Sequence, residues 1–167
     1  MAFNNNLIFG IEDFDTKDKI SNQNQNIGNE QIELALNIAL NAHKGQVDLD
    51  GYPAILHPLS VGIEGQNVLE KCVGFLHDVV EDSGYTFDDL LNLGVSPSVV
   101  NALRLLNYDK SVPYMDYIRN IEASGNITVL KVKMNDLRHN LRRGIAGGHT
   151  KQVKKHTEAL EYFFKLS

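Results

Sequence analysis

The segment between residues 77 and 82 carries the strongest chemical signal in this sequence. It reads His77-Asp78-Val79-Val80-Glu81-Asp82. On a helix, Asp78, Glu81 and Asp82 share one face, where each like-charged pair costs roughly a few tenths of a kcal/mol. They also stand in the last turn, where the helix dipole disfavours anions. A bound cation would reverse both effects; the alternative is a solvated acidic helix end beside a core histidine.

Two more residues of metal-ligand type lie on apolar helix faces. His43 continues an apolar stripe that begins at Ile32, although a lone histidine there is more often a core residue than a ligand. Asp136 shares a face with Val132, and a buried carboxylate needs a partner or a metal. Two imidazoles and two carboxylates suit an octahedral ion such as Mn²⁺ or Fe²⁺ better than structural zinc, which prefers thiolates. The four candidates are His43, His77, Asp78 and Asp136.

Helical periodicity predicts the elements that position these residues. The predicted helices cover residues 29–44, 58–65, 67–82, 97–106, 113–124 and 127–143, with a short helix opening at Thr86 and a last one capped by Thr150. The front half of 127–143 alternates like a strand, but its length and its i, i+4 polar pairing favour a helix. Residues 144–148 are expected to form a flexible loop. We therefore expect an all-α bundle of about seven or eight helices.

Composition narrows the class of protein. The 167 residues carry 16 Lys and Arg against 21 Asp and Glu, a net charge of −5, so a nucleic-acid polymer is an unexpected partner. Cys72 is the single cysteine, which excludes an internal disulfide and a cysteine-based zinc module. The apolar runs are too short to span a membrane, and the start of the chain has no basic leader, so we expect a cytoplasmic protein. Residues 1–28 are predicted to be an Asn-rich, partly disordered extension before a domain at 29–167.

Four sequence words resemble a known family. They are AHKGQ (42–46), GYP…HP (51–58), FLHDVVED (75–82) and KMNDLRHNLR (133–142). Their order is similar to that of the HD-domain metal-dependent phosphohydrolases, above all the hydrolase domain of the RelA/SpoT group and its small stand-alone relatives. The resemblance covers residues 30–165. It implies an all-α HD-domain bundle that removes the 3′-pyrophosphate of (p)ppGpp.

The resemblance also implies roles for individual residues. The metal ligands would be His43, His77, Asp78 and Asp136. Glu81 and Asp82 would position and deprotonate the attacking water, as a general base and its partner. His57 is expected to support the metal ligands without binding the metal, to anchor its loop, or, slightly ahead of these, to be a buried structural histidine; His139 is left without a role. His149 and His156 are expected at the surface.

Substrate binding needs an amide and cations beside the metal. Asn140 lies one helical turn after Asp136 and so faces the same cleft, and the resemblance assigns it to the sugar or a phosphate. Lys44 is a candidate cation. The resemblance selects Arg142 from the last motif, whereas helical spacing places Arg143 on the cleft face.

Departures from the family pattern leave the substrate open. Leu137 and Arg138 have traded places relative to the usual block, and Ala54 stands where the family has a tyrosine. Beside (p)ppGpp hydrolysis we keep two alternatives: phosphohydrolase activity on a nucleoside monophosphate or NADPH, and a non-catalytic nucleotide-sensing HD module. The expected cofactor is one divalent ion, Mn²⁺ ahead of Mg²⁺, Fe²⁺ and Zn²⁺. The expected partner is a small phosphorylated nucleotide.

Overall fold

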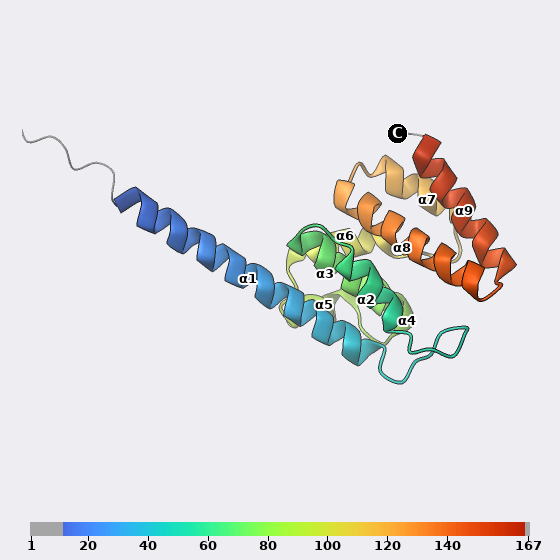
Figure 1. The fold of residues 1–167 in the computed structure, drawn as a ribbon, viewed down its shortest axis with the longest axis horizontal. Helices are drawn as coiled ribbons and strands as arrows, with labels where there is room; N and C mark the ends of the chain where they lie inside the picture. Colours follow the sequence, from blue (N-terminus) through green and yellow to red (C-terminus); the bar gives the residue numbers. More distant parts are fainter. Residues whose placement is uncertain (1–11, 166–167) are drawn as a thin grey trace, which may run out of the picture.

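The protein is an all-α bundle, as the sequence predicts. A computed structural model describes the backbone of residues 12–165 and the side chains of residues 25, 26 and 28–165. Figure 1 shows the helices of this part of the chain, and no strand is present within it. The helices are α1 (Glu12–Ala42), α2 (Leu56–Ile63), α3 (Val68–Leu76), α4 (Val79–Asp82), α5 (Phe87–Asn92), α6 (Pro97–Leu106), α7 (Tyr114–Ala123), α8 (Ile127–Ala146) and α9 (Thr150–Lys165).

Local sequence explains where several helices begin. Thr86 and Asp89 form a capping box at the start of α5, with each side chain bonding the other residue's backbone N–H. Pro97 occupies the first turn of α6, where its missing N–H costs nothing. The side chain of Asn126 accepts a hydrogen bond from the backbone N–H of Val129 and caps α8. These residues fix where α5, α6 and α8 begin.

Helix α8 is the central element of the bundle. It packs against α2, α3, α6 and α9, and buries Val129, Val132 and Leu137 completely. The prediction of a helix rather than a strand at 127–143 is confirmed. The predicted loop at 144–148 is wrong in part, because α8 runs on to Ala146. The chain turns at Gly148, whose φ of +71° suits a residue without a side chain.

The predicted helix at 67–82 is interrupted at His77 and Asp78. Helix α3 ends at Leu76, and α4 restarts at Val79 with Asp78 as its N-cap. The ring of His77 bonds the carbonyl oxygen of Gly74 at 2.7 Å through Nδ1, so a side chain satisfies a backbone acceptor at the end of α3. The break places His77 and Asp78 between two helices, where both side chains turn toward α2 and α8.

Two glycines let α2 and α3 approach closely. A Cβ atom added to Gly74 would lie 2.7 Å from the Cα of Gly62, and one added to Gly62 would overlap the ring of Phe75. Backbone contact at this point leaves no room for any other residue. The close approach brings the first turn of α2, with His57, beside the end of α3, with His77.

The N-terminal segment is described only in part. The backbone of α1 is helical from Glu12, earlier than the predicted start near Asn29. Its first half contains Glu, Lys and Gln residues, which favour a helix without an apolar stripe. The expectation of disorder for residues 1–11 lies outside the described residues, and the domain boundary at 28/29 stays a prediction. Among the described residues, every helix is too short or too polar for a membrane span.

Candidate active site

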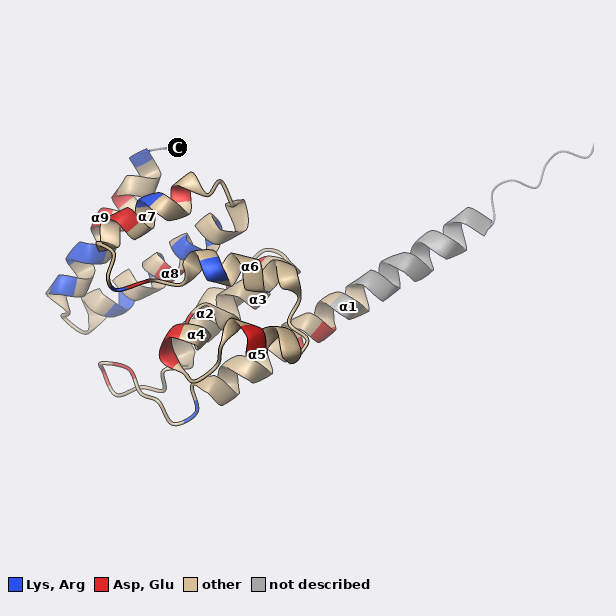
Figure 2. Cartoon of the chain, turned by 180° about the vertical axis from the view of Figure 1, so that it is seen from behind, with Lys and Arg blue, Asp and Glu red and all other residues tan. Residues whose placement is uncertain are grey.

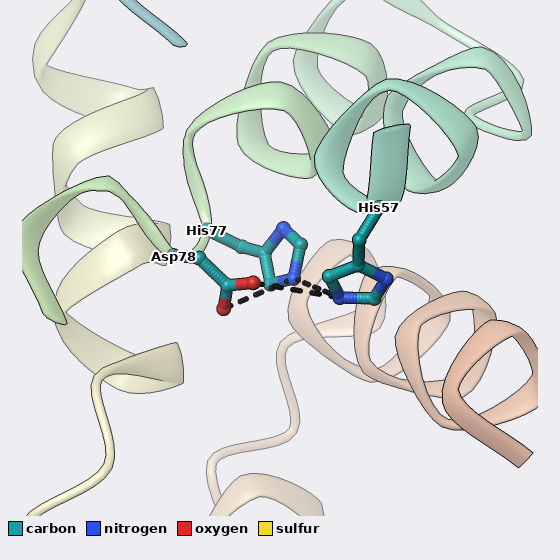
Figure 3. Close-up of side chains that lie close together, drawn as sticks. All are labelled: His57, His77 and Asp78. Carbon is teal, nitrogen blue, oxygen red and sulfur yellow. Dashed lines mark hydrogen bonds and ion pairs between the residues drawn. The ribbon is translucent and has the colours of Figure 1, made fainter. Parts of the chain in front are cut away.

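Two imidazoles and a carboxylate from separate segments converge at the centre of the molecule. Figure 3 shows His57 of α2 facing His77 and Asp78, which lie between α3 and α4. The Nε2 atoms of His57 and His77 are 3.2 Å apart. Asp78 places one carboxylate oxygen 3.2 Å from Nε2 of His77 and the other 3.4 Å from Nε2 of His57. Both rings are buried, so their polar edges face one another rather than solvent.

Asp136 of α8 completes a set of four. Its Oδ1 atom lies 3.1 Å from Nε2 of His57 and 3.7 Å from Nε2 of His77. The same oxygen accepts a hydrogen bond from the side-chain amide of Asn140, one turn later on α8. Oδ2 accepts from the ammonium of Lys133 at 2.7 Å. Lys133 and Asn140 therefore hold the buried Asp136 carboxylate with one oxygen toward the two imidazoles.

Each histidine ring makes a hydrogen bond on the side that faces away from the cluster, and Nε2 is the nitrogen that faces the cluster. The Nδ1 atom of His77 must donate to Gly74, because a carbonyl oxygen only accepts. The Nδ1 atom of His57 lies 2.8 Å from Nδ1 of His139. Burial and the charge of His57 lower the pKa of His139 to about 4, so at neutral pH His139 is uncharged and can accept the proton of His57. A neutral His77 ring therefore presents Nε2 as its lone-pair nitrogen, and a neutral His57 ring does the same when its Nδ1 donates to His139.

The four side chains fit a divalent cation. Neighbouring ligands of an octahedral ion with bonds of about 2.1 Å lie about 3 Å apart. The distances of 3.1 to 3.7 Å among the donor atoms of His57, His77, Asp78 and Asp136 match that spacing. Two imidazoles with two carboxylates form a donor set that suits Mn²⁺, Fe²⁺ or Zn²⁺. The hydrogen bond from His77 to a backbone carbonyl is the kind that usually orients a ligating histidine.

The cluster has strong internal electrostatics even without a cation. Burial lowers the pKa of His77, but the charges of Asp78 and Asp136 outweigh burial and raise that pKa well above its ordinary value. Burial raises the pKa of Asp78, yet the neighbouring His77 brings it down to about 2. For Asp136, Lys133 overcomes the effect of burial and keeps the pKa well below the usual range. Both carboxylates are therefore ionised at any physiological pH and require a positive partner.

The carboxyl groups of Glu81 and Asp82, unlike those of Asp78 and Asp136, have raised pKa values. Burial and the nearby charge of Asp78 raise the pKa of both Glu81 and Asp82. Glu81 also accepts a hydrogen bond at 2.8 Å from the backbone N–H of Tyr108. A carboxylate with a raised pKa accepts a proton more readily, which is what a general base requires.

A small cavity of about 140 Å³ opens beside these residues. Its lining includes His77, Asp78, Glu81, Tyr108, Tyr114, Tyr117, Lys133, Asp136, Asn140, Lys155 and His156. The Lys155 ammonium lies 4.6 Å from the Tyr114 ring centre and has no carboxylate partner within the described part of the chain. Figure 2 shows that Lys and Arg gather on α8 and α9, whereas α4 and α5 carry Asp and Glu. The α8–α9 side can therefore attract an anion although the net charge is negative.

The structure does not bring His43 into the cluster. The potential ligands that lie close together among the described residues are His57, His77 and Asp78, which Asp136 joins, and His43 instead bonds Gln46. The structure therefore groups His57, rather than His43, with His77 and Asp78, and the metal-ligand role of each residue stays a prediction. Both histidines are buried, His43 in the turn just after α1 and His57 in α2, and both fall in predicted apolar segments, so periodicity alone could not separate them. The second of the four family words could have indicated His57, since His57 is the histidine of GYP…HP.

The predicted basic residues lie away from the cavity. Arg142 bonds Glu64 at 2.8 Å, and Arg143 bonds Asp48 at 2.9 Å. Neither arginine lines the cavity, and nor does the exposed Lys44. The cations that do line it are Lys133 and Lys155, which were not among the predicted cations. Lys133 is three residues before Asp136, so the i, i+3 spacing could have indicated it.

His156 corrects another expectation. It was expected at the surface, but only 7% of it is exposed, and it lines the cavity. Burial and the neighbouring Lys155 lower its pKa to about 4. It belongs to the inward face of α9, together with Ala159 and Phe163. His149, by contrast, is partly exposed and bonds Asp50 at 2.8 Å.

Comparison with known proteins shows related sequences and a shared fold. No protein-family model matches the sequence. A GTP pyrophosphokinase from Streptomyces coelicolor (strain ATCC BAA-471 / A3(2) / M145) is 32% identical over 147 residues, which cover 82% of this chain and 17% of that protein. A GTP pyrophosphokinase from Myxococcus xanthus is 28% identical over 151 residues, which cover 81% of this chain and 20% of that protein. The chain thus spans about a fifth of the length of the curated relatives that it matches.

A solved structure has the same architecture. It is that of a metazoan ortholog of SpoT, described as hydrolysing ppGpp and playing a role in starvation responses. The TM-score is 0.62 at 24% identity, and the alignment covers 78% of this chain and 85% of the other. The similarity establishes a common all-α fold.

Proposed function

We propose that the protein is a metal-dependent hydrolase of a phosphate or pyrophosphate ester of a small nucleotide. The observation that carries the proposal is the convergence of His57, His77, Asp78 and Asp136 within 3.1 to 3.7 Å. These residues would hold one divalent ion, with Mn²⁺ as the first candidate. A bound ion of this kind lowers the pKa of water and neutralises phosphoryl oxygens.

Glu81 and Asp82, the acidic pair on α4, would take up the proton of the attacking water. Glu81 lines the same cavity as Asp78 and Asp136, and its raised pKa suits a group that accepts a proton from water. Asp82 is the next residue and has a raised pKa as well, so it would support Glu81 as a partner. This pair argues against a module that only senses nucleotides, because binding alone does not need a base.

The polar lining of the cavity supports a phosphorylated substrate. Lys133 and Lys155 supply positive charge, and Asn140 supplies an amide beside Asp136. Partial burial and Lys133 lower the pKa of Lys155, and an anion bound between the two ammonium groups would relieve that repulsion. We place the 3′-pyrophosphate of (p)ppGpp first among substrates, on the family resemblance and on the reported activity of the metazoan structural relative.

One observation keeps a second substrate class under consideration. Arg143, the cation that helical spacing placed at the cleft, is neutralised by Asp48. Together with Leu137 and Ala54, which depart from the family pattern, this favours a changed pocket for the base or sugar. A nucleoside monophosphate or the phosphate of NADPH is the alternative substrate.

A product-resolved assay tests the proposal. Metal-stripped protein is incubated with and without Mn²⁺ over ppGpp and a panel of nucleotides with 3′- and 5′-phosphates. Pyrophosphate released from ppGpp only with metal would establish an alarmone hydrolase. Phosphate released from another nucleotide would keep the metal chemistry and change the substrate. Failure to release either product from any substrate, while Mn²⁺ is bound, would contradict the proposal.

A further inference from the structure

A buried histidine and a glutamine connect the end of α1 to the acidic helix α4. The Nδ1 atom of His43, a residue only 3% exposed, lies 2.9 Å from Oε1 of Gln46. The Gln46 amide nitrogen bonds the backbone carbonyl of Asp82 at 2.8 Å and that of Ala42 at 3.3 Å. The hydrogen-bonded path therefore runs from His43 through Gln46 to Asp82.

The hydrogen-bonding partners define the protonation of this path. Both neighbours of the Gln46 amide nitrogen are carbonyl oxygens, which only accept, so that nitrogen donates to them and Oε1 faces His43. Because Oε1 accepts, Nδ1 of His43 carries the proton and donates it. Nε2 of His43 is buried without a hydrogen-bond partner in the described region. The ring is thus held by a donated bond and lies outside the cluster of His57, His77 and Asp78.

Helix α4 needs support of this kind. It has four residues, its N-cap Asp78 makes no side-chain capping bond, and its last turn contains no basic residue. Its final two residues, Glu81 and Asp82, are carboxylates at the end where the helix dipole opposes negative charge. A single turn of helix is not stable alone. Glu81 is fixed by the backbone N–H of Tyr108, and the Asp82 end is fixed by Gln46.

We propose that His43 and Gln46 are positioning residues that hold the end of α4, and with it the carboxylates of Glu81 and Asp82, in register with the metal cluster. The inference rests on the proposed function only in assigning proton transfer to these two carboxylates. His43 acts through the amide of Gln46 and does not touch the metal. Loss of the donated hydrogen bond frees Gln46, and the last turn of α4 loses its anchor on the turn that follows α1.

The test compares His43→Asn with His43→Leu. The Asn amide can occupy the place of Nδ1–H and keep the bond to Gln46, whereas Leu has a similar size and no donor. In His43→Leu we expect faster hydrogen–deuterium exchange at the backbone amides of residues 80–83 and a kcat about 10-fold to 100-fold lower, with KM unchanged. His43→Asn should recover most of both properties. Mn²⁺ affinity should stay within about 3-fold of wild type in both variants, whereas His57→Asn should weaken it by more than about 100-fold.

Further variants keep the test decisive. Gln46 is only partly buried, so Gln46→Leu should fold even if His43→Leu does not, and it should show the same exchange and kcat effects. The double variant should be no worse than either single variant, because the two residues act in series. Wild-type exchange in a folded His43→Leu or Gln46→Leu protein would overturn the inference, and so would loss of Mn²⁺ binding in His43→Asn. If the wild-type protein hydrolyses nothing, the proposed function fails, but the exchange and Mn²⁺ measurements still decide the roles of His43 and Gln46.

Discussion

The site contains four carboxylates, those of Asp78, Glu81, Asp82 and Asp136. Their surroundings lower the pKa of two of them and raise the pKa of the other two. Asp78 and Asp136 lie against imidazoles or an ammonium, which keep their pKa values low. Glu81 and Asp82 are buried beside the negative Asp78 and have raised pKa values. The low pair is suited to hold a cation, and the raised pair is suited to accept a proton.

Replacing Glu81 by Gln tests this division of labour. The amide keeps the shape of the side chain and can still accept from the N–H of Tyr108, but it cannot take a proton. We expect kcat to fall about 10²-fold to 10⁴-fold with little change in Mn²⁺ affinity. Glu122→Gln, on the exposed face of α7, is the matched control and should behave as wild type. A kcat within a few-fold of wild type in Glu81→Gln would remove Glu81 from proton transfer.

At the residue scale, the sequence predicts part of the cluster and misplaces one member. His77, Asp78 and Asp136 were selected, and the structure brings them together. The sequence pattern favours His43 over His57, because both residues are buried and the sequence does not say which ring nitrogen faces which neighbour. The sequence also does not identify Lys133 and Lys155 as the cations of the cavity, since only the packing of α8 and α9 shows which cations reach it.

At the scale of elements, capping residues and apolar stripes predict where helices lie, but they do not predict a break within a helical segment. Thr86, Pro97 and Asn126 begin helices as their types suggest. The break at His77 and Asp78 was missed because the apolar periodicity continues through it. The break depends on a hydrogen bond from the side chain of His77 to the backbone carbonyl of Gly74, and helix propensities do not describe such a bond.

The contact between α2 and α3 gives a prediction at the same scale. Gly74→Ala would place a Cβ atom 2.7 Å from the backbone of Gly62 and separate the helices that carry His57 and His77. We expect the free energy of unfolding to fall by about 1–3 kcal/mol, measured by urea denaturation. Gly84→Ala is the control, because no atom lies within 4 Å of its added Cβ and its φ is not positive. Equal stability of the two variants would contradict the close packing described for α2 and α3.

At the scale of the whole molecule, the separation of charge could not be read from the sequence. The composition gives a net charge of −5, which is unfavourable for an anionic substrate. In the folded chain, Lys and Arg gather on α8 and α9, and two of them line the cavity. The fold thus creates a local positive region that an average over the sequence conceals.

The burial of His156 predicts a pH dependence of overall stability. Its pKa falls from 6.5 to about 4 in the folded protein, so the unfolded chain binds an additional proton between these values. The uptake of this proton by the unfolded chain lowers the free energy of unfolding as the pH falls from 6.5 toward 4. Above pH 6.5 neither state is protonated at His156, and the free energy of unfolding is not reduced. In His156→Gln, urea denaturation should therefore show a smaller loss of stability over this range than in wild type. An equal loss in both proteins would show that His156 is freely protonated in the folded state.

The central claim is that hydrolysis depends on the cluster of His57, His77, Asp78 and Asp136. The most direct measurement follows pyrophosphate and phosphate release from ppGpp by metal-stripped wild type and Asp78→Ala, each with and without Mn²⁺, after circular dichroism has shown that both are folded. We predict release by wild type only when Mn²⁺ is present, and none by Asp78→Ala under either condition. Metal-dependent release by Asp78→Ala at the wild-type rate would contradict the account.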